Sequence, residues 1–196
     1  MTSLEEFRDL SDTETRIMEA TIRAFLKFGP KKLTMSDVAE EAALTRKTVY
    51  VNFQNRDTLL GEMVKFIAHR QLARVREAWR DCATLSDMLA VYSRIVVIEP
   101  FESVQSSADP QEMVNIPGEA GRIADVDVRD MHTAMWKEHL GSYAATLQEK
   151  GSSPERIARF IVTTNLNLKK SESDRTRLID QLADLQTVIL AMTDAA

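Results

Sequence analysis

The sequence has few of the residues that break helices or cross-link chains. Its 196 residues include one cysteine, six glycines and five prolines, and aromatic residues make up only 6%. Cys82 alone cannot form an intrachain disulfide, which favours the reducing cytoplasm as the compartment. The scarcity of chain breakers and aromatics favours helices over a sheet-rich fold, so we expect an all-α protein.

The sequence also lacks a long hydrophobic run. No segment approaches the roughly 20 apolar residues that a membrane-spanning helix needs, and the acidic N-terminus has no apolar stretch of the kind found in secretion signals. Hydrophobic residues still make up 44% of the chain, which is enough for a sizeable core. We expect no membrane partner, and either one medium domain or a small domain attached to a larger one.

Motifs typical of enzymes are absent as well. The chain has no glycine-rich phosphate loop, no His-Glu-x-x-His motif and no cysteine–histidine pairing, so we expect no enzymatic activity. His132 and His139 are seven residues apart on one helical face, with Asp125, Asp127 and Asp130 nearby. These residues are too few and too scattered to predict a metal site, and we expect neither a metal nor another cofactor.

Positive charge is concentrated in one segment of an acidic chain. The net charge is −5, yet residues 27–56 hold six basic and three acidic residues, a local charge of +3. One basic segment suits a protein that contacts nucleic-acid phosphates with a single surface. It also suits a solvated surface without a partner, so charge alone leaves both interpretations open.

Capping signals and hydrophobic spacing predict about nine helices. Capping-box patterns begin at Ser11, Thr34 and Thr84, while Gly29 and Pro100 are expected to end helices. The expected helices lie at about 12–28, 35–42, 46–52, 56–80, 85–99, 110–115, 123–149, 154–169 and 173–193.

Two short helices within residues 33–53 form the most specific pattern. Leu44, in the turn, can fill the angle between the helices, and the second helix directs Val49 inward. This arrangement is typical of a helix-turn-helix, whose second helix enters the major groove of DNA. We therefore expect a three-helix DNA-binding domain over residues 1–55 and a helical sensing and dimerisation domain over 56–196.

The second of these short helices has suitable residue types on its outer side. Arginine and lysine donate to guanine or phosphate, threonine can contact a thymine methyl group, and tyrosine donates to phosphate. The outward residues are Arg46, Lys47, Thr48, Tyr50 and Asn52. The pattern favours DNA binding over a helical bundle with an incidental helix pair.

Residues 15–66 resemble the DNA-binding domain of TetR-family regulators. The resemblance rests on Arg16-Ile17, Ala20, Phe25, Gly29, Leu33-Thr34-Met35, Val38 to Ala42, Leu44 to Tyr50, Phe53, Arg56-Asp57 and Leu59-Leu60. The chain departs from the family pattern at Ala43, where a glycine is usual, and at Pro30, where an aromatic residue is usual. A positive φ at Ala43 would cost on the order of 1 kcal/mol.

The resemblance implies where this chain would bind its partners. Helices four to seven would enclose an inducer pocket, and the last two helices, 154–169 and 173–193, would form a four-helix bundle with a second subunit. The residues at the family's DNA-contacting positions are Thr34, Thr45, Arg46, Lys47, Thr48, Tyr50, Asn52 and Arg56.

Aromatic, methionine and histidine side chains in the second domain are candidates for an effector site. Methionines and aromatic rings suit a small-molecule pocket, and the same residue types also form ordinary hydrophobic cores, so both interpretations stay open. The candidates are Trp79, Met88, Tyr92, Ile95, Met131, His132, Met135 and Trp136.

Wide apolar stripes on the last two helices need a covering surface, either the chain's own core or a second subunit. A homodimer also agrees with a helix-turn-helix that contacts two half-sites roughly 34 Å apart, one turn of DNA. The residues assigned to the dimer interface are Ile157, Phe160, Ile161, Leu178, Leu182, Leu185 and Ile189.

The main hypothesis is a ligand-responsive transcriptional regulator. It would be a homodimeric repressor of double-stranded operator DNA, released when an unidentified small-molecule effector binds. The alternative is a helical adaptor or small-molecule-binding bundle without sequence-specific DNA binding, and the basic pair Arg46 and Lys47 argues against it.

Overall fold

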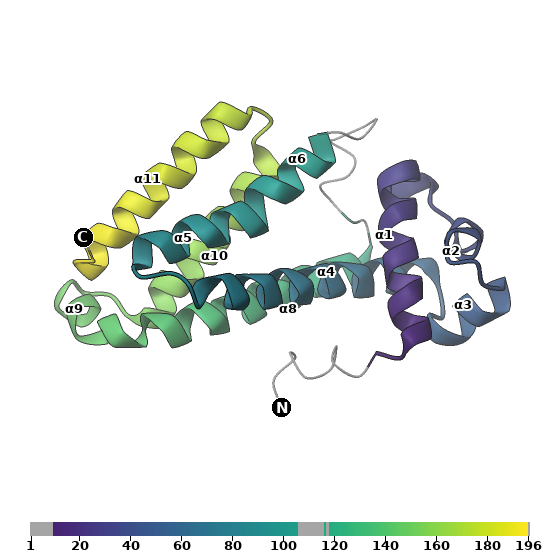
Figure 1. Cartoon of the computed structure of the whole chain (residues 1–196), viewed down its shortest axis with the longest axis horizontal. Coiled ribbons are helices and arrows are strands. Elements are labelled where there is room, and N and C mark those ends of the chain that lie inside the picture. Colours follow the sequence, from purple (N-terminus) through teal and green to yellow (C-terminus); the bar gives the residue numbers. More distant parts are fainter. Residues whose placement is uncertain (1–9, 106–115, 117, 196) are drawn as a thin grey trace. The chain divides into compact units, whose positions relative to one another are not determined.

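The structure is a computed structural model, and it describes residues 10–105, 116 and 118–195. Within these ranges every regular element is a helix, as the sequence predicts (Figure 1). None of the helices in the described ranges is both long and apolar enough to cross a membrane. The short helix expected at 110–115 lies outside the described residues.

The described residues form eight continuous helical stretches. Nine helices were expected, and eight of them fall within the described residues, so the two numbers agree. The eight stretches are α1 (Asp12–Lys32), α2 (Met35–Glu41), α3 (Arg46–Asn52), α4 (Arg56–Trp79), α5–η1–α6 (Leu85–Ser93, Arg94–Ile98 and Glu99–Gln105), α8–η2–α9 (Glu119–His139, Leu140–Tyr143 and Ala144–Glu149), α10 (Pro154–Ser171) and α11 (Arg175–Thr193).

The chain divides into two compact units. Unit 1 contains the residues up to 70 together with 103–128, and unit 2 contains 71–102 together with 129–196. The first turns of α4 belong to the core of unit 1, where Leu59, Leu60 and Met63 are buried with residues of α1–α3. Unit 1 therefore extends past residue 55, the domain boundary predicted from the sequence.

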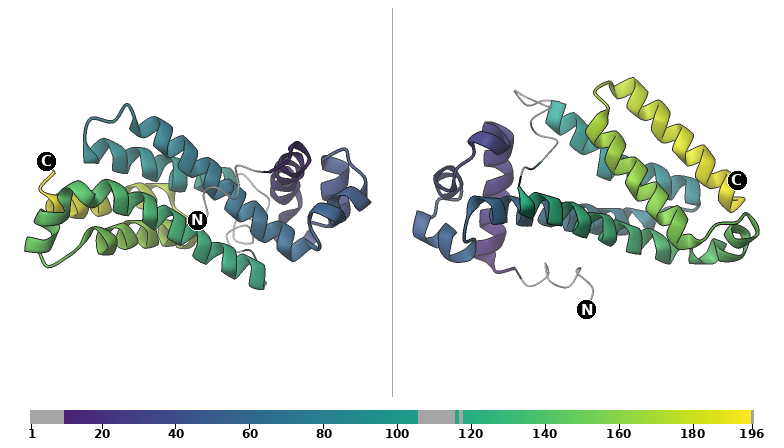
Figure 2. Two further views of the ribbon diagram at one scale, coloured as in Figure 1. Left: turned by 90° about the horizontal axis from the view of Figure 1, so that it is seen from below. Right: turned by 180° about the vertical axis from the view of Figure 1, so that it is seen from behind.

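Side-chain caps fix the starts of α1 and α2 as predicted. Ser11 Oγ accepts a hydrogen bond from the Glu14 N–H at 3.2 Å, and the Glu14 carboxylate accepts one from the Ser11 N–H at 2.8 Å. Thr34 and Asp37 form the same reciprocal pair at the start of α2. The caps satisfy N–H groups that have no partner within the helix, so both helices begin at defined residues. Both views of Figure 2 show α1, α2 and α3 grouped together.

The backbone leaves helical geometry at Gly29, where φ is 76° and ψ is 164°. Glycine adopts this conformation without a steric penalty, and Pro30 follows it. A last turn then reaches Lys32, and the Leu33 N–H donates to the Gly29 carbonyl at 3.1 Å. The helix expected to end at Gly29 is therefore kinked there and ends one turn later, at Lys32.

Pro100 does not end the helix that begins at Leu85, so this prediction was wrong. The helix continues through the π-helical turn η1, in which the Glu99 N–H donates to the Arg94 carbonyl five residues earlier, and then through α6. The wider π turn accommodates a proline, which lacks an N–H and would crowd a regular α-helical turn. α8 also begins earlier than expected, at Glu119 rather than near residue 123.

Candidate nucleic-acid interface and effector site

A tight turn with a left-handed residue joins α2 to α3. Ala43 has a φ of 49°, its N–H donates to the Glu40 carbonyl at 3.0 Å, and the Leu44 N–H donates to the Ala39 carbonyl at 2.9 Å. These two hydrogen bonds form a Schellman motif, whose left-handed position is usually a glycine. The positive φ expected at Ala43 is therefore confirmed. Arg16 also donates to the Ala43 carbonyl, at 3.4 Å.

Thr45 and Val49 set the orientation of α3. Thr45 Oγ1 accepts a hydrogen bond from the Thr48 N–H at 3.1 Å and lies 2.9 Å from the Thr48 hydroxyl. Val49 is fully buried in the core of unit 1. Because the cap fixes the start of α3 and Val49 fixes its rotation, the opposite side of this helix faces solvent.

The predicted DNA-contacting residues all lie in unit 1, on or beside α2, α3 and the start of α4. Five are exposed and three are half-buried. The exposed ones are Thr34, Thr45, Arg46, Lys47 and Tyr50, and the half-buried ones are Thr48, Asn52 and Arg56.

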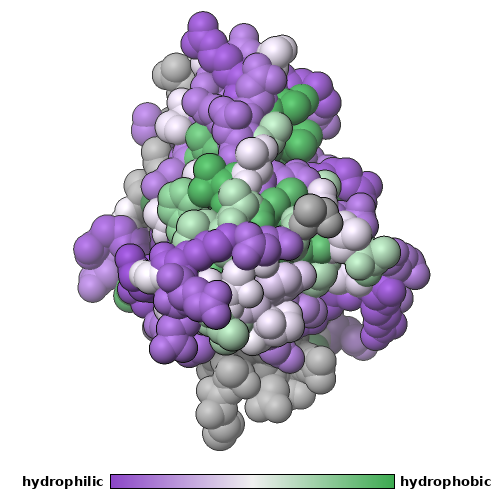
Figure 3. Space-filling model, turned by 90° about the vertical axis from the view of Figure 1, so that its left-hand side faces the viewer, coloured by the Kyte–Doolittle hydropathy of each residue, from purple (hydrophilic) through white to green (hydrophobic). Residues whose placement is uncertain are grey.

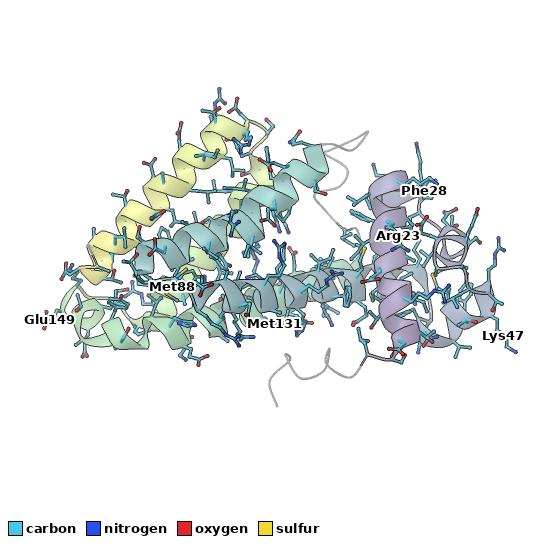
Figure 4. The ribbon with its side chains drawn as sticks, in the orientation of Figure 1. Arg23, Phe28, Lys47, Met88, Met131 and Glu149 are labelled. Atoms are coloured by element: carbon cyan, nitrogen blue, oxygen red, sulfur yellow. The ribbon has the colours of Figure 1, made fainter. Side chains whose placement is uncertain are left out.

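Arg46 and Lys47 present free positive charges. Both side chains are exposed, and neither forms an ion pair or a side-chain hydrogen bond with the residues that the structure describes. Figure 4 shows Lys47 on α3 pointing away from α1. Arg23 differs, because its Nε lies 2.7 Å from the Glu41 carboxylate. Exposed, unpaired cations on a short helix suit contact with phosphates and base edges.

Asn52 and Arg56 are bound to the protein itself. Asn52 Nδ2 donates to the Thr48 carbonyl at 2.7 Å, and Arg56 Nε donates to the Leu33 carbonyl at 2.7 Å. The second bond joins the start of α4 to the residue that ends α1. Arg56 therefore has a positioning role within unit 1, which sequence spacing did not reveal because its partner lies 23 residues away.

Residues 17–63 match the model of the family described as bacterial regulatory proteins, tetR family. This range runs from α1 into α4 and contains the whole α2–α3 pair with its turn. This part of the chain is therefore similar to the tetR family of bacterial regulatory proteins.

Proteins similar to this chain are also named as regulators. It is 32% identical over 95 residues to the HTH-type transcriptional regulator TtgR of Pseudomonas putida, a match that covers 45% of each protein and so less than half of TtgR. It is 22% identical over 187 residues to the uncharacterized HTH-type transcriptional regulator Mb2274c of Mycobacterium bovis, covering 95% of this chain and 94% of that protein. The fatty acid degradation regulator FadR of Bacillus halodurans has the same fold, with a TM-score of 0.68 and 12% identity over 93% of this chain and 96% of FadR.

Unit 2 contains a buried aromatic cluster made of predicted effector-site residues. The ring centroids of Trp79 and Trp136 lie 4.7 Å apart, and those of Tyr92 and Trp136 lie 5.2 Å apart. The Tyr92 hydroxyl and His132 Nδ1 share a hydrogen bond of 2.8 Å. All four side chains are buried. Burial raises the pKa of Tyr92, so its phenol stays neutral.

The other predicted effector-site residues belong to the same unit. Ile95, Met131 and Met135 are buried, while Met88 is half-buried and its carbonyl accepts a hydrogen bond of 2.9 Å from Trp79 Nε1. Figure 4 labels Met88 on α5 and Met131 on α8. These contacts agree with a hydrophobic core and with an effector site alike.

The two histidines considered as metal ligands have aromatic partners instead. His132 is bonded to Tyr92, and the His139 ring packs edge-on against Trp79 with a centroid distance of 4.4 Å. Partial desolvation lowers the pKa of His139, although the residue is exposed overall. No group of three or more metal-ligating side chains occurs in the described part of the chain.

Most residues assigned to the dimer interface are already covered within one chain. Phe160 is 46% exposed, and Ile179 and Val188 are exposed on the same helix pair. Figure 3 views the side that carries α9 and the C-terminus, where hydrophobic side chains gather between hydrophilic ones. The six assigned residues that are buried are Ile157, Ile161, Leu178, Leu182, Leu185 and Ile189.

Proposed function

We propose that this chain is a ligand-responsive transcriptional repressor. It binds double-stranded operator DNA as a homodimer and releases the DNA when a small molecule binds unit 2. The observation that carries this proposal is the exposed, unpaired state of Arg46 and Lys47 on a helix whose opposite side is fixed in the core by Val49. Such a helix can enter a major groove without first breaking internal ion pairs.

DNA binding and effector sensing are assigned to different parts of the chain. Residues 1–55 with the first turns of α4 bind DNA, and the helices that follow sense the effector and dimerise. Thr34 and Thr45 stand at the N-termini of α2 and α3, where the first-turn N–H groups that the caps leave unbound favour phosphate. Because operator DNA is cytoplasmic in bacteria, the protein acts there, and binding and release need no catalytic step.

A second subunit is expected to cover the outward apolar residues of α10 and α11. Phe160, Ile179 and Val188 are large hydrophobic side chains exposed on these helices. Their burial in a dimer would give the protein two DNA-binding heads, matching two half-sites roughly 34 Å apart. Sedimentation equilibrium tests this: Phe160→Glu should shift the protein from dimer to monomer, whereas Ile123→Glu, an exposed position in unit 1, should not.

The interior of unit 2 favours an uncharged effector. Its buried polar residues, within the described part, are Gln71, His132, Asn165 and Thr193, with no buried aspartate, glutamate, lysine or arginine. A permanently charged ligand would lose its hydration there without meeting a countercharge, which is costly. A neutral aromatic compound with one hydrogen-bonding group fits the rings and the Tyr92–His132 pair better.

Release of DNA follows from differential binding. An effector that binds the DNA-free arrangement more tightly than the DNA-bound one shifts the population by that difference in affinity. A panel of matched neutral and charged aromatic compounds tests the preference for a neutral effector by thermal shift. The compounds that bind are then tested for release of DNA. Compounds that bind unit 2 and never change DNA affinity would contradict the release mechanism.

The DNA-binding part is tested by titrating the protein against the DNA upstream of its own gene at two salt concentrations. Arg46→Ala/Lys47→Ala should abolish saturable, salt-sensitive binding to one short site. The control Arg94→Ala/Arg177→Ala removes two exposed arginines from unit 2, with the same change in net charge, and should bind as wild type does. Equal loss in both variants would mean that net charge, and not α3, determines the affinity.

A further inference from the structure

One aliphatic residue of α3 is exposed beside the polar residues that are predicted to contact DNA. Val51 is 76% exposed, the highest value of any large hydrophobic side chain in the described residues. Valine is a weaker helix former than the straight-chain residues, because its branched Cβ restricts χ1. Neither burial nor helix propensity therefore accounts for a valine at this position.

Val51 lies on the same side of α3 as Lys47. The two residues are four positions apart, so they are neighbours one turn apart on the helix surface. Each is two positions from the buried Val49, and two positions correspond to about 200° of rotation. Lys47 and Val51 therefore both project away from the core, at the centre of the exposed side of α3, with exposed Tyr50 beside them.

The chemistry of this surface matches a major groove. The basic residues Arg46 and Lys47 supply the charge that complements phosphates, and they form no ion pairs with the described residues. Among the four bases only thymine presents a methyl group in the major groove, at C5, and aliphatic side chains recognise it by contact. Valine brings two methyl groups and few rotamers, so it loses little freedom on binding.

We propose that Val51 is a specificity-determining residue that packs against the C5 methyl of a thymine in each operator half-site. The proposal rests on the DNA-binding function proposed above. The phosphate contacts position the protein on DNA but do not recognise sequence. The Val51 contact would add recognition of one base.

The test removes the methyl group from the DNA and from the protein separately. An operator is first selected from a random duplex library with wild-type protein, and each thymine is then replaced in turn by deoxyuridine. The wild type should lose affinity by about fourfold per methyl contact at one position of each half-site. Val51→Ala should bind the unmodified operator more weakly and show no further loss from deoxyuridine at that position.

The matched control is Val126→Ala, which shortens another exposed valine of unit 1, 57% exposed on α8. It should keep the wild-type pattern at every thymine, and circular dichroism should show equal folding of all three proteins. If Val51→Ala keeps the wild-type sensitivity to deoxyuridine everywhere, the inference is wrong while DNA binding stands. If the wild type selects no sequence from the library, the proposed function itself fails.

Discussion

The Asp57 carboxylate accepts a hydrogen bond from the backbone N–H of Ala120, with 3.3 Å between Oδ2 and N. Asp57 lies in the first turn of α4 and Ala120 in the first turn of α8, where N–H groups lack partners within the helix. A carboxylate at this end also interacts favourably with the helix dipole. Two glycines permit the approach, because a Cβ at Gly61 would lie 2.9 Å from the Ala120 oxygen and one at Gly118 would overlap the Asp57 carboxylate.

Gly118→Ala should destabilise the protein. Gly118 has a φ of 98°, which side-chain-bearing residues rarely adopt, and the new methyl group would displace Asp57 from its place beside Ala120. Strain of this kind costs about 1–3 kcal/mol. Guanidinium unfolding measures the loss. The control is Gly141→Ala, where a Cβ meets nothing within 4 Å and no positive φ is required. Equal stability of the two variants would contradict this view of the contact.

Ala43 and Gly151 make a matched pair for the cost of a left-handed residue. Gly151 has a φ of 71° and lies in a Schellman motif as well. Its N–H donates to the Gln148 carbonyl, and the Ser152 N–H donates to the Leu147 carbonyl. Ala43→Gly should stabilise the protein and Gly151→Ala should destabilise it, each by on the order of 1 kcal/mol. Thermal melting of the two variants checks the opposite signs. Changes of the same sign would show that neighbouring contacts outweigh backbone strain.

Tyr92→Phe should weaken unit 2 by about 1–3 kcal/mol, because it removes a hydroxyl that is bonded to His132 in a buried environment. Urea unfolding gives the free energy, and the same variant should show a reduced thermal shift with any neutral aromatic compound that binds the wild type. Tyr50→Phe is the control, since the Tyr50 side chain is exposed on α3 and its hydroxyl should not affect stability. If Tyr92→Phe left the free energy of unfolding unchanged, the hydrogen bond between Tyr92 and His132 would not be stabilising.

His139 should make the protein less stable below neutral pH. Partial desolvation lowers the pKa of His139 in the folded protein, so the unfolded chain binds a proton at a higher pH than the folded chain does. Stability should therefore be full above the ordinary histidine pKa of about 6.5 and decrease as pH falls through it. NMR titration of the His139 ring should give a pKa below that value, and His139→Gln should flatten the pH dependence of stability between about pH 5 and 7. A ring that titrates at or above the ordinary value would contradict the prediction.

Local signals in the sequence predicted much of unit 1. The capping boxes at Ser11 and Thr34, the break at Gly29 and the left-handed Ala43 depend on neighbours within a few residues, so their patterns are visible in the chain. The π turn before Pro100 was missed because the proline rule assumes a regular helix on both sides.

Contacts between distant residues were not predictable from spacing. Spacing placed Arg56 among the predicted DNA contacts and could not show that its Nε also donates to the Leu33 carbonyl, at 2.7 Å. Apolar periodicity identified the hydrophobic sides of α10 and α11. It did not show which of these hydrophobic residues are buried within one chain. Six assigned interface residues are buried within the chain, and Ile179 and Val188 are exposed instead.

Operator recognition by α3 is tested by selecting genomic DNA fragments with the purified protein, with Arg46→Ala/Lys47→Ala as the comparison. If α3 recognises the operator, the wild type enriches a short palindrome whose half-sites are roughly 34 Å apart, and the variant enriches none. Enrichment of no sequence by the wild type, or of the same sequence by both proteins, would contradict the assignment of operator recognition to α3.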